Sequence, residues 1–92
     1  MRIRAYATLQ EVVGGSVLDR DLPGGATVGE ILRILAEEHP GLGDKLWDEK
    51  GNLRGYINVL LNGRSIEYLQ GELTPVKAAD TLSLFPPVGG GC

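Results

Sequence analysis

The sequence predicts one α+β domain, in which a mixed sheet of four to five strands carries one main helix on one face. Two observations favour this fold class. Short apolar segments with a period of two occur at both ends and in the middle of the chain, whereas a single stretch, residues 28–36, has the 3.6-residue period of a helix. With 92 residues and 42% apolar content, the chain can build one modest core but not two.

The first strand is expected at the N-terminus, because residues 1–9 alternate. The residues expected on its inner face are Met1, Ile3, Ala5 and Ala7. A second strand is predicted over residues 16–22. The segment between them, Val13-Gly14-Gly15, is typical of a tight turn, so we expect the two strands to form an antiparallel hairpin.

The main helix is predicted to begin after Pro23-Gly24-Gly25, since Thr27 and Glu30 match a capping box. One apolar stripe then follows at helical spacing, formed by Val28, Ile31, Leu32, Leu35 and Ala36. His39-Pro40-Gly41 ends the helix, because a residue before proline is disfavoured in the α region. We expect the stripe to pack on the sheet.

The second half of the chain supplies the remaining strands. A short helical turn is expected over residues 43–47 and a polar loop over 48–52. A strand over residues 56–61 should point Ile57, Val59 and Leu61 to one face. The Asn62-Gly63 pair predicts a two-residue turn, from which residues 64–66 return as a short strand. Residues 68–79 are expected to be irregular, and residues 82–85 to form the closing strand.

Composition narrows the class of protein. Nine basic and twelve acidic residues give a net charge of −3, which argues against nucleic acid as a partner. No apolar run approaches the roughly 20 residues needed to cross a bilayer, so a cytoplasmic location without membrane association is expected. One cysteine and one histidine exclude an internal disulfide and a zinc site made by this chain alone.

The C-terminal segment is the most distinctive part of the sequence. Pro86-Pro87 ends the last strand and should direct the chain away from the domain, since proline lacks the N–H that a sheet needs. Gly89, Gly90 and Gly91 have no side chains to add to a core and have a high ordering entropy. We therefore expect a folded domain over residues 1–88 and a flexible tail over residues 89–92, narrow enough to enter a partner's active-site channel.

Four segments together resemble the ubiquitin-like sulfur-carrier family. They are residues 4–11 (RAYATLQE), 25–32 (GATVGEIL), 56–63 (YINVLLNG) and 80–88 (DTLSLFPPV), followed by the glycines. The family includes the small subunit of molybdopterin synthase, the thiamine-pathway carrier and the carrier that serves a cysteine synthase. The resemblance implies a ubiquitin-like β-grasp fold.

The resemblance also implies a function in which the chain is not itself an enzyme. An E1-like adenylating enzyme would use ATP to activate the Gly91 carboxylate, and a sulfur donor would then convert it to a thiocarboxylate. A sulfur-accepting synthase would use that sulfur, in molybdopterin, thiamine, cysteine or thiolated tRNA formation. No cofactor is expected to be bound by the chain. Two alternatives stay open: a modifier joined through Gly91 to lysines of other proteins, and a β-grasp interaction module with an inert tail.

Cys92 departs from the family pattern. The family normally ends on the second glycine of a diglycine, which corresponds here to Gly91, and Cys92 blocks the Gly91 carboxyl group. Three interpretations are possible. Cys92 is an encoded cap removed by a peptidase, for example a zinc-dependent one; or it corresponds to a product of cysteine synthesis; or it is an engineered residue. We favour the encoded cap.

A docking surface is expected around Tyr56, Leu60 and Phe85, on the sheet face away from the helix. Packing in the core is the alternative for Tyr56 and Leu60. His39 is interpreted as part of the helix C-terminus rather than as a catalytic base, since no nucleophile or second base accompanies it.

Overall fold

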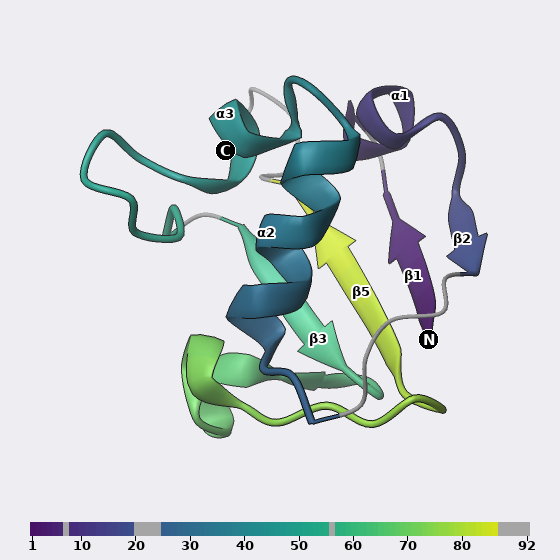
Figure 1. The fold of residues 1–92 in the computed structure, drawn as a ribbon, viewed down its shortest axis with the longest axis vertical. Coiled ribbons are helices and arrows are strands. Elements are labelled where there is room, and N and C mark those ends of the chain that lie inside the picture. Colours follow the sequence, from purple (N-terminus) through teal and green to yellow (C-terminus); the bar gives the residue numbers. More distant parts are fainter. Residues whose placement is uncertain (7, 20–24, 56, 87–92) are drawn as a thin grey trace.

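The computed structural model describes residues 1–6, 8–19, 25–55 and 57–86. Its five-stranded sheet consists of β1 (Arg2–Ala5), β2 (Val17–Asp19), β3 (Asn58–Leu61), β4 (Arg64–Ser65) and β5 (Thr81–Phe85). The strand order is β2-β1-β5-β3-β4 (Figure 1). β1 runs parallel to β5, and the other neighbours are antiparallel. The predicted mixed sheet of the β-grasp fold is therefore confirmed.

Alternation along the two central strands separates a buried face from an open one. In β1, Ile3 and Ala5 are buried, whereas Arg2 and Arg4 are exposed. In β5, Leu82 and Leu84 are fully buried, whereas the other three residues are half-buried. Because successive strand residues point to opposite faces, each strand contributes to both faces of the sheet.

The main helix, α2 (Val28–Glu38), covers the buried face (Figure 1). The Thr27 hydroxyl oxygen accepts a hydrogen bond from the Glu30 amide at 3.3 Å, as the predicted capping box requires. Four residues of the predicted apolar stripe have no exposed surface: Val28, Ile31, Leu32 and Leu35. Ala36, the fifth, is half-buried. The helix ends as predicted at His39, whose amide donates to the Leu35 carbonyl.

The prediction of a hairpin between the first two strands is wrong about the segment that connects them. β1 and β2 do pair antiparallel, but β1 ends at Ala5 and a helix, α1 (Thr8–Val13), follows. Leu9 and Val13 lie four positions apart, which places both on the buried side of α1. A glycine directly after the helix is the signal that the sequence offered, because glycine is common just after a helix C-terminus. In the structure Gly14 has a φ of +82°, and its amide donates to the Gln10 carbonyl. Of the expected inner residues, Ala7 lies outside the described part of the chain.

The other elements agree with their predictions to within a few residues. The short helix is α3 (Leu42–Leu46), and the second strand covers only part of residues 16–22, of which 20–22 lie outside the described residues. Asn62 and Gly63 both have positive φ, 52° and 85°, as a type I′ turn requires. Ile66 does not extend β4 but begins a 3-10 helix, η1 (Ile66–Tyr68), and a second one, η2 (Gly71–Leu73), lies in the segment expected to be irregular.

Candidate functional site: the chain exit and the open face of the sheet

The described chain ends just after a central strand of the sheet. β5 lies between β1 and β3, and after Phe85 the chain reaches Pro86, which is buried. Gly89, Gly90, Gly91 and Cys92 follow this exit in the sequence and lie outside the described residues, as does the boundary expected at residue 88. The C-terminal segment that is expected to be activated therefore follows a central strand of the sheet, not an edge strand.

Beside this exit lies the open face, which we define as the sheet surface opposite α2. The strand register places Arg4, Ser83, Leu60 and Ser65 in one row across β1, β5, β3 and β4. Leu60 is half-buried there, between Val59 and Leu61, which point into the core. The structure therefore assigns Leu60 to the open face, while Tyr56 lies outside the described residues.

Phe85 takes part in an aromatic stack at the exit. Its ring and that of Tyr6 are 4.2 Å apart between centroids and inclined by 9°. The Tyr6 amide also donates to the Leu84 carbonyl at 3.2 Å, which fixes the end of β1 against the end of β5. Sequence reasoning missed Tyr6, because the stack depends on a parallel pairing between segments about 80 residues apart in sequence.

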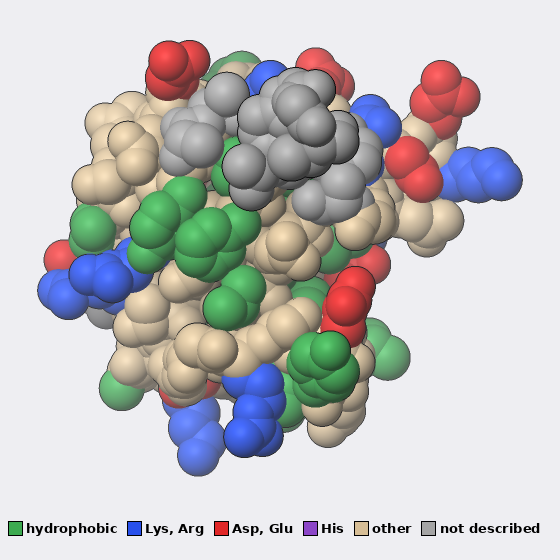
Figure 2. All heavy atoms as spheres, turned by 180° about the vertical axis from the view of Figure 1, so that it is seen from behind, with side chains coloured by type: hydrophobic (Ala, Val, Ile, Leu, Met, Phe, Trp, Pro, Cys, Tyr) green, Lys and Arg blue, Asp and Glu red, His purple; other side chains and the backbone are tan. Residues whose placement is uncertain are grey.

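The surroundings of the stack are partly apolar and partly charged. Figure 2 shows hydrophobic side chains gathered on this face, with basic and acidic side chains at its margin. Val17, opposite Arg4 in the β1–β2 pairing, is 43% exposed. An apolar surface with a charged rim is typical of a protein interface.

One ion pair borders the face. Arg2 Nε donates to Asp19 Oδ1 at 3.0 Å. The hydrogen bond from Arg2 lowers the pKa of the Asp19 carboxyl, and the same bond raises the pKa of Arg2. Within the described ranges Arg4 has no salt bridge, so its charge is available to a partner.

The remaining polar candidates do not come together. Asp19 pairs with Arg2, whereas Asp80 accepts hydrogen bonds from Asn62 and Lys77. His39 Nε2 is buried and has no hydrogen-bond partner among the described residues. In the part of the chain that the structure describes, no group of three or more histidine, cysteine, aspartate or glutamate side chains could hold a metal ion. No helix among these residues is long and apolar enough to cross a membrane.

The chain is similar in sequence to small carrier and modifier proteins. It is 40% identical to small archaeal modifier protein 3 of Haloferax volcanii over 91 residues, covering 99% of this chain and 98% of that protein. It is 42% identical to small archaeal modifier protein 1 of the same organism, covering 99% and 100%. A protein of Archaeoglobus fulgidus named "Putative sulfur carrier protein" is 31% identical over 65 residues, 71% of this chain and 74% of that protein.

Solved structures agree with this likeness. The crystal structure of SAMP1 from Haloferax volcanii has a TM-score of 0.86 at 38% identity, covering 98% of this chain and 97% of that one. A chain of the BexX/CysO complex from Amycolatopsis orientalis has a TM-score of 0.80 at 31% identity and 98% coverage of both. The sequence model of the ThiS family matches residues 3–91. With this match, the β-grasp topology and the exit beside an open sheet face, the chain belongs to the ThiS family of ubiquitin-like sulfur carriers.

Proposed function

We propose that this protein carries sulfur on the carboxyl group of Gly91. The observation that most strongly supports the proposal is the family match, which runs to residue 91. The geometry adds a rigid origin for the tail, since the chain leaves from a central strand next to the Tyr6–Phe85 stack. The folded domain then provides the surface that partner enzymes bind, and those enzymes supply the catalysis.

The chemistry takes place in two steps on the tail. A Gly91 carboxylate oxygen attacks the α-phosphorus of ATP in an E1-like enzyme, forming the acyl-adenylate and releasing pyrophosphate. Hydrosulfide then attacks the acyl carbon, AMP leaves with its electron pair, and a proton passes to solvent. Glycines suit this reaction because only a chain without side chains passes through a narrow channel.

Cys92 must be removed first, because its peptide bond occupies the carboxyl group of Gly91. A peptidase, for example a zinc-dependent one, would hydrolyse this bond. We further propose a cytoplasmic location and a sulfur-accepting synthase as the downstream partner. The BexX/CysO complex, which contains a chain of this fold, supports a protein partner of that kind.

The open face is the proposed docking surface for the activating enzyme; it includes Leu60 in β3 and Phe85 at the chain exit, and Tyr56 precedes Leu60 by four residues in the sequence. Leu60 is half-buried in the isolated chain, so a partner that covers it gains apolar burial. Val17 extends the apolar area, and Arg4 adds one positive charge at its side.

The test uses a chain that ends at Gly91, incubated with ATP, the activating enzyme and sodium sulfide. Intact-mass spectrometry should show the exchange of one oxygen atom for sulfur, while the chain that retains Cys92 should stay unchanged. Leu60→Ala should lower kcat/KM for adenylation by about tenfold, as a central interface residue does. Leu73→Ala is the matched control, because Leu73 is 73% exposed and lies in η2, away from the open face.

The resemblance to small archaeal modifier proteins favours a second function for the same adenylate. A lysine amine of another protein would attack the acyl carbon in place of hydrosulfide, and AMP would leave. If the chain ending at Gly91 appears only in lysine adducts and never as a thiocarboxylate, the modifier function replaces the carrier function. If it is never adenylated, both are wrong.

A further inference from the structure

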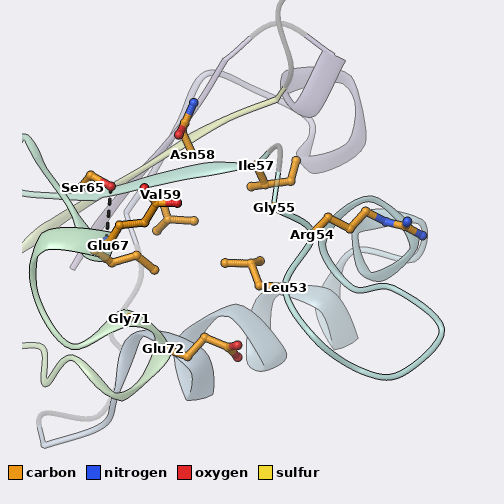
Figure 3. Close-up of a pocket in the computed structure, with 11 residues that line it drawn as sticks. Leu53, Arg54, Gly55, Ile57, Asn58, Val59, Ser65, Glu67, Gly71 and Glu72 are labelled. Carbon is orange, nitrogen blue, oxygen red and sulfur yellow. Dashed lines mark hydrogen bonds between the residues drawn. The ribbon is translucent and has the colours of Figure 1, made fainter.

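A second surface is centred on a cavity at the free edge of β3, close to η1 and η2. The cavity has a volume of about 180 Å³. Its apolar walls come from Leu53, Ile57, Val59 and Ile66. Figure 3 shows Leu53 projecting toward this space, whereas Arg54 extends away from it. Since an apolar cavity of about 150 Å³ accommodates one benzene-sized group, this one has room for a single leucine-sized side chain.

The neighbouring strand edge is partly unpaired. β3 pairs with β5 along all four residues, but with β4 only at Leu60 and Leu61. Among the described strands, none lies on the other side of Asn58 and Val59, which both line the cavity. The Asn62 amide donates to the Thr81 carbonyl, so by alternation the N–H of Val59 points away from β5, toward this edge. Such an edge can accept a peptide as an additional strand.

The charges at the rim are negative. Glu67 and Glu72 both line the cavity, and neither forms a salt bridge with a described residue. Arg54 does not neutralise them, because its Nε donates to the Asp44 carbonyl at 3.2 Å. A segment with positive side chains on both sides of its apolar residue therefore complements this rim.

Exposed apolar side chains extend the surface. Tyr68 in η1 is 81% exposed and Leu73 in η2 is 73% exposed. These two helices lie toward the end of the sheet where β5 begins, whereas the described chain leaves at the opposite end of β5 (Figure 1). A partner that contacts η1 and η2 would therefore lie away from this exit, whereas the β3 edge at Asn58 is level with Phe85 in the strand register.

We propose that the cavity and the β3 edge form a docking site for an extended basic peptide segment of a partner protein. One aliphatic side chain of the segment fills the cavity, its backbone runs beside Asn58 and Val59, and flanking lysines approach Glu67 and Glu72. The site is independent of the chemistry at Gly91.

The probe is the peptide acetyl-Lys-Thr-Leu-Thr-Lys-amide, titrated into the full-length ¹⁵N-labelled protein. Its leucine and both lysines share one face of an extended chain. Saturable amide shifts should appear at residues 57–59, 66–67 and 71–72 and be absent from β1. Replacing the peptide's leucine by glycine should weaken binding at least about tenfold, because one buried aliphatic side chain is lost.

Protein variants test the charges. Glu67→Gln combined with Glu72→Gln should weaken binding about fivefold, as two partly exposed ion pairs are lost. Glu37→Gln, on the exposed side of α2, is the matched control and should leave the affinity unchanged. The amide spectra of all variants verify that they fold. The proposal is overturned if the shifts do not saturate, if they map to the open face, or if the glycine peptide or the double variant binds equally well.

Discussion

At the residue scale, Asp80 shows how one carboxylate joins two elements. Its Oδ1 accepts a hydrogen bond from Asn62 Nδ2 at 3.0 Å, and its Oδ2 accepts one from the Lys77 amide at 2.8 Å. Asn62 Oδ1 in turn accepts from the Thr81 amide at 2.9 Å. The turn after β3 is thereby fastened to the start of β5, and the hydrogen bond from Asn62 lowers the pKa of Asp80.

This pKa shift predicts a pH dependence of stability. A carboxyl whose pKa is lower in the folded state stabilises the fold above its unfolded pKa, and the contribution is lost as the pH falls below that value. Asp80→Asn should therefore reduce the free energy of unfolding at pH 7, by less than about 1 kcal/mol because solvent screens the partly exposed carboxylate. The difference from the unmodified chain should shrink as the pH falls through the ordinary aspartate value of 3.8.

Urea titrations at several pH values, followed by fluorescence of the single tryptophan, Trp47, measure this difference. Asp44→Asn, at an exposed position in α3, is the control for the removal of one negative charge. A constant difference between Asp80→Asn and the unmodified chain across the pH range would contradict the assignment.

At the scale of elements, α2 carries the largest local share of the core. Its inner residues have no exposed surface, and Gly29 lets the helix lie close to η2, since a Cβ there would stand 3.1 Å from Glu72 Cβ. Sequence predicted this helix well because its cap, its stripe and its stop signal are all local. The same approach failed for α1, whose first two residues, Thr8 and Leu9, continue the alternating pattern that predicts the first strand.

Truncation on the inner face of α2 should be costly. Leu32→Ala should reduce the free energy of unfolding by roughly 2–5 kcal/mol, as truncations of buried leucines do. Glu37→Ala, on the exposed face, should change it by less than about 0.5 kcal/mol. Equal, small changes in denaturant titrations would mean that the helix face is misassigned.

At the scale of the whole molecule, the fold and the tail should be separable. The buried apolar side chains among the described residues run from Ile3 to Pro86, before the tail begins. A chain ending at Val88 should therefore unfold at nearly the same temperature as the full chain, because the glycines add no side chain to the core. A large drop in the midpoint, measured by circular dichroism, would show that the tail is packed against the domain.

The sequence by itself determined the elements whose signals lie within a few residues. The capping box at Thr27, the stripe of α2, the Asn62-Gly63 turn and the proline pair after Phe85 each act locally, so they could be predicted without a structure. The glycine tail and the expected role of Gly91 also came from sequence alone.

Contacts between residues far apart in the sequence became known from the three-dimensional arrangement of the strands. The parallel pairing of β1 with β5 brings Tyr6 onto Phe85, and the early end of β4 leaves part of β3 beside the cavity. The same pairing lets the Tyr6 amide, just after the end of β1, donate to the Leu84 carbonyl. These contacts join segments whose order in space is set by burial of the whole core, and no local pattern in the sequence specifies that order.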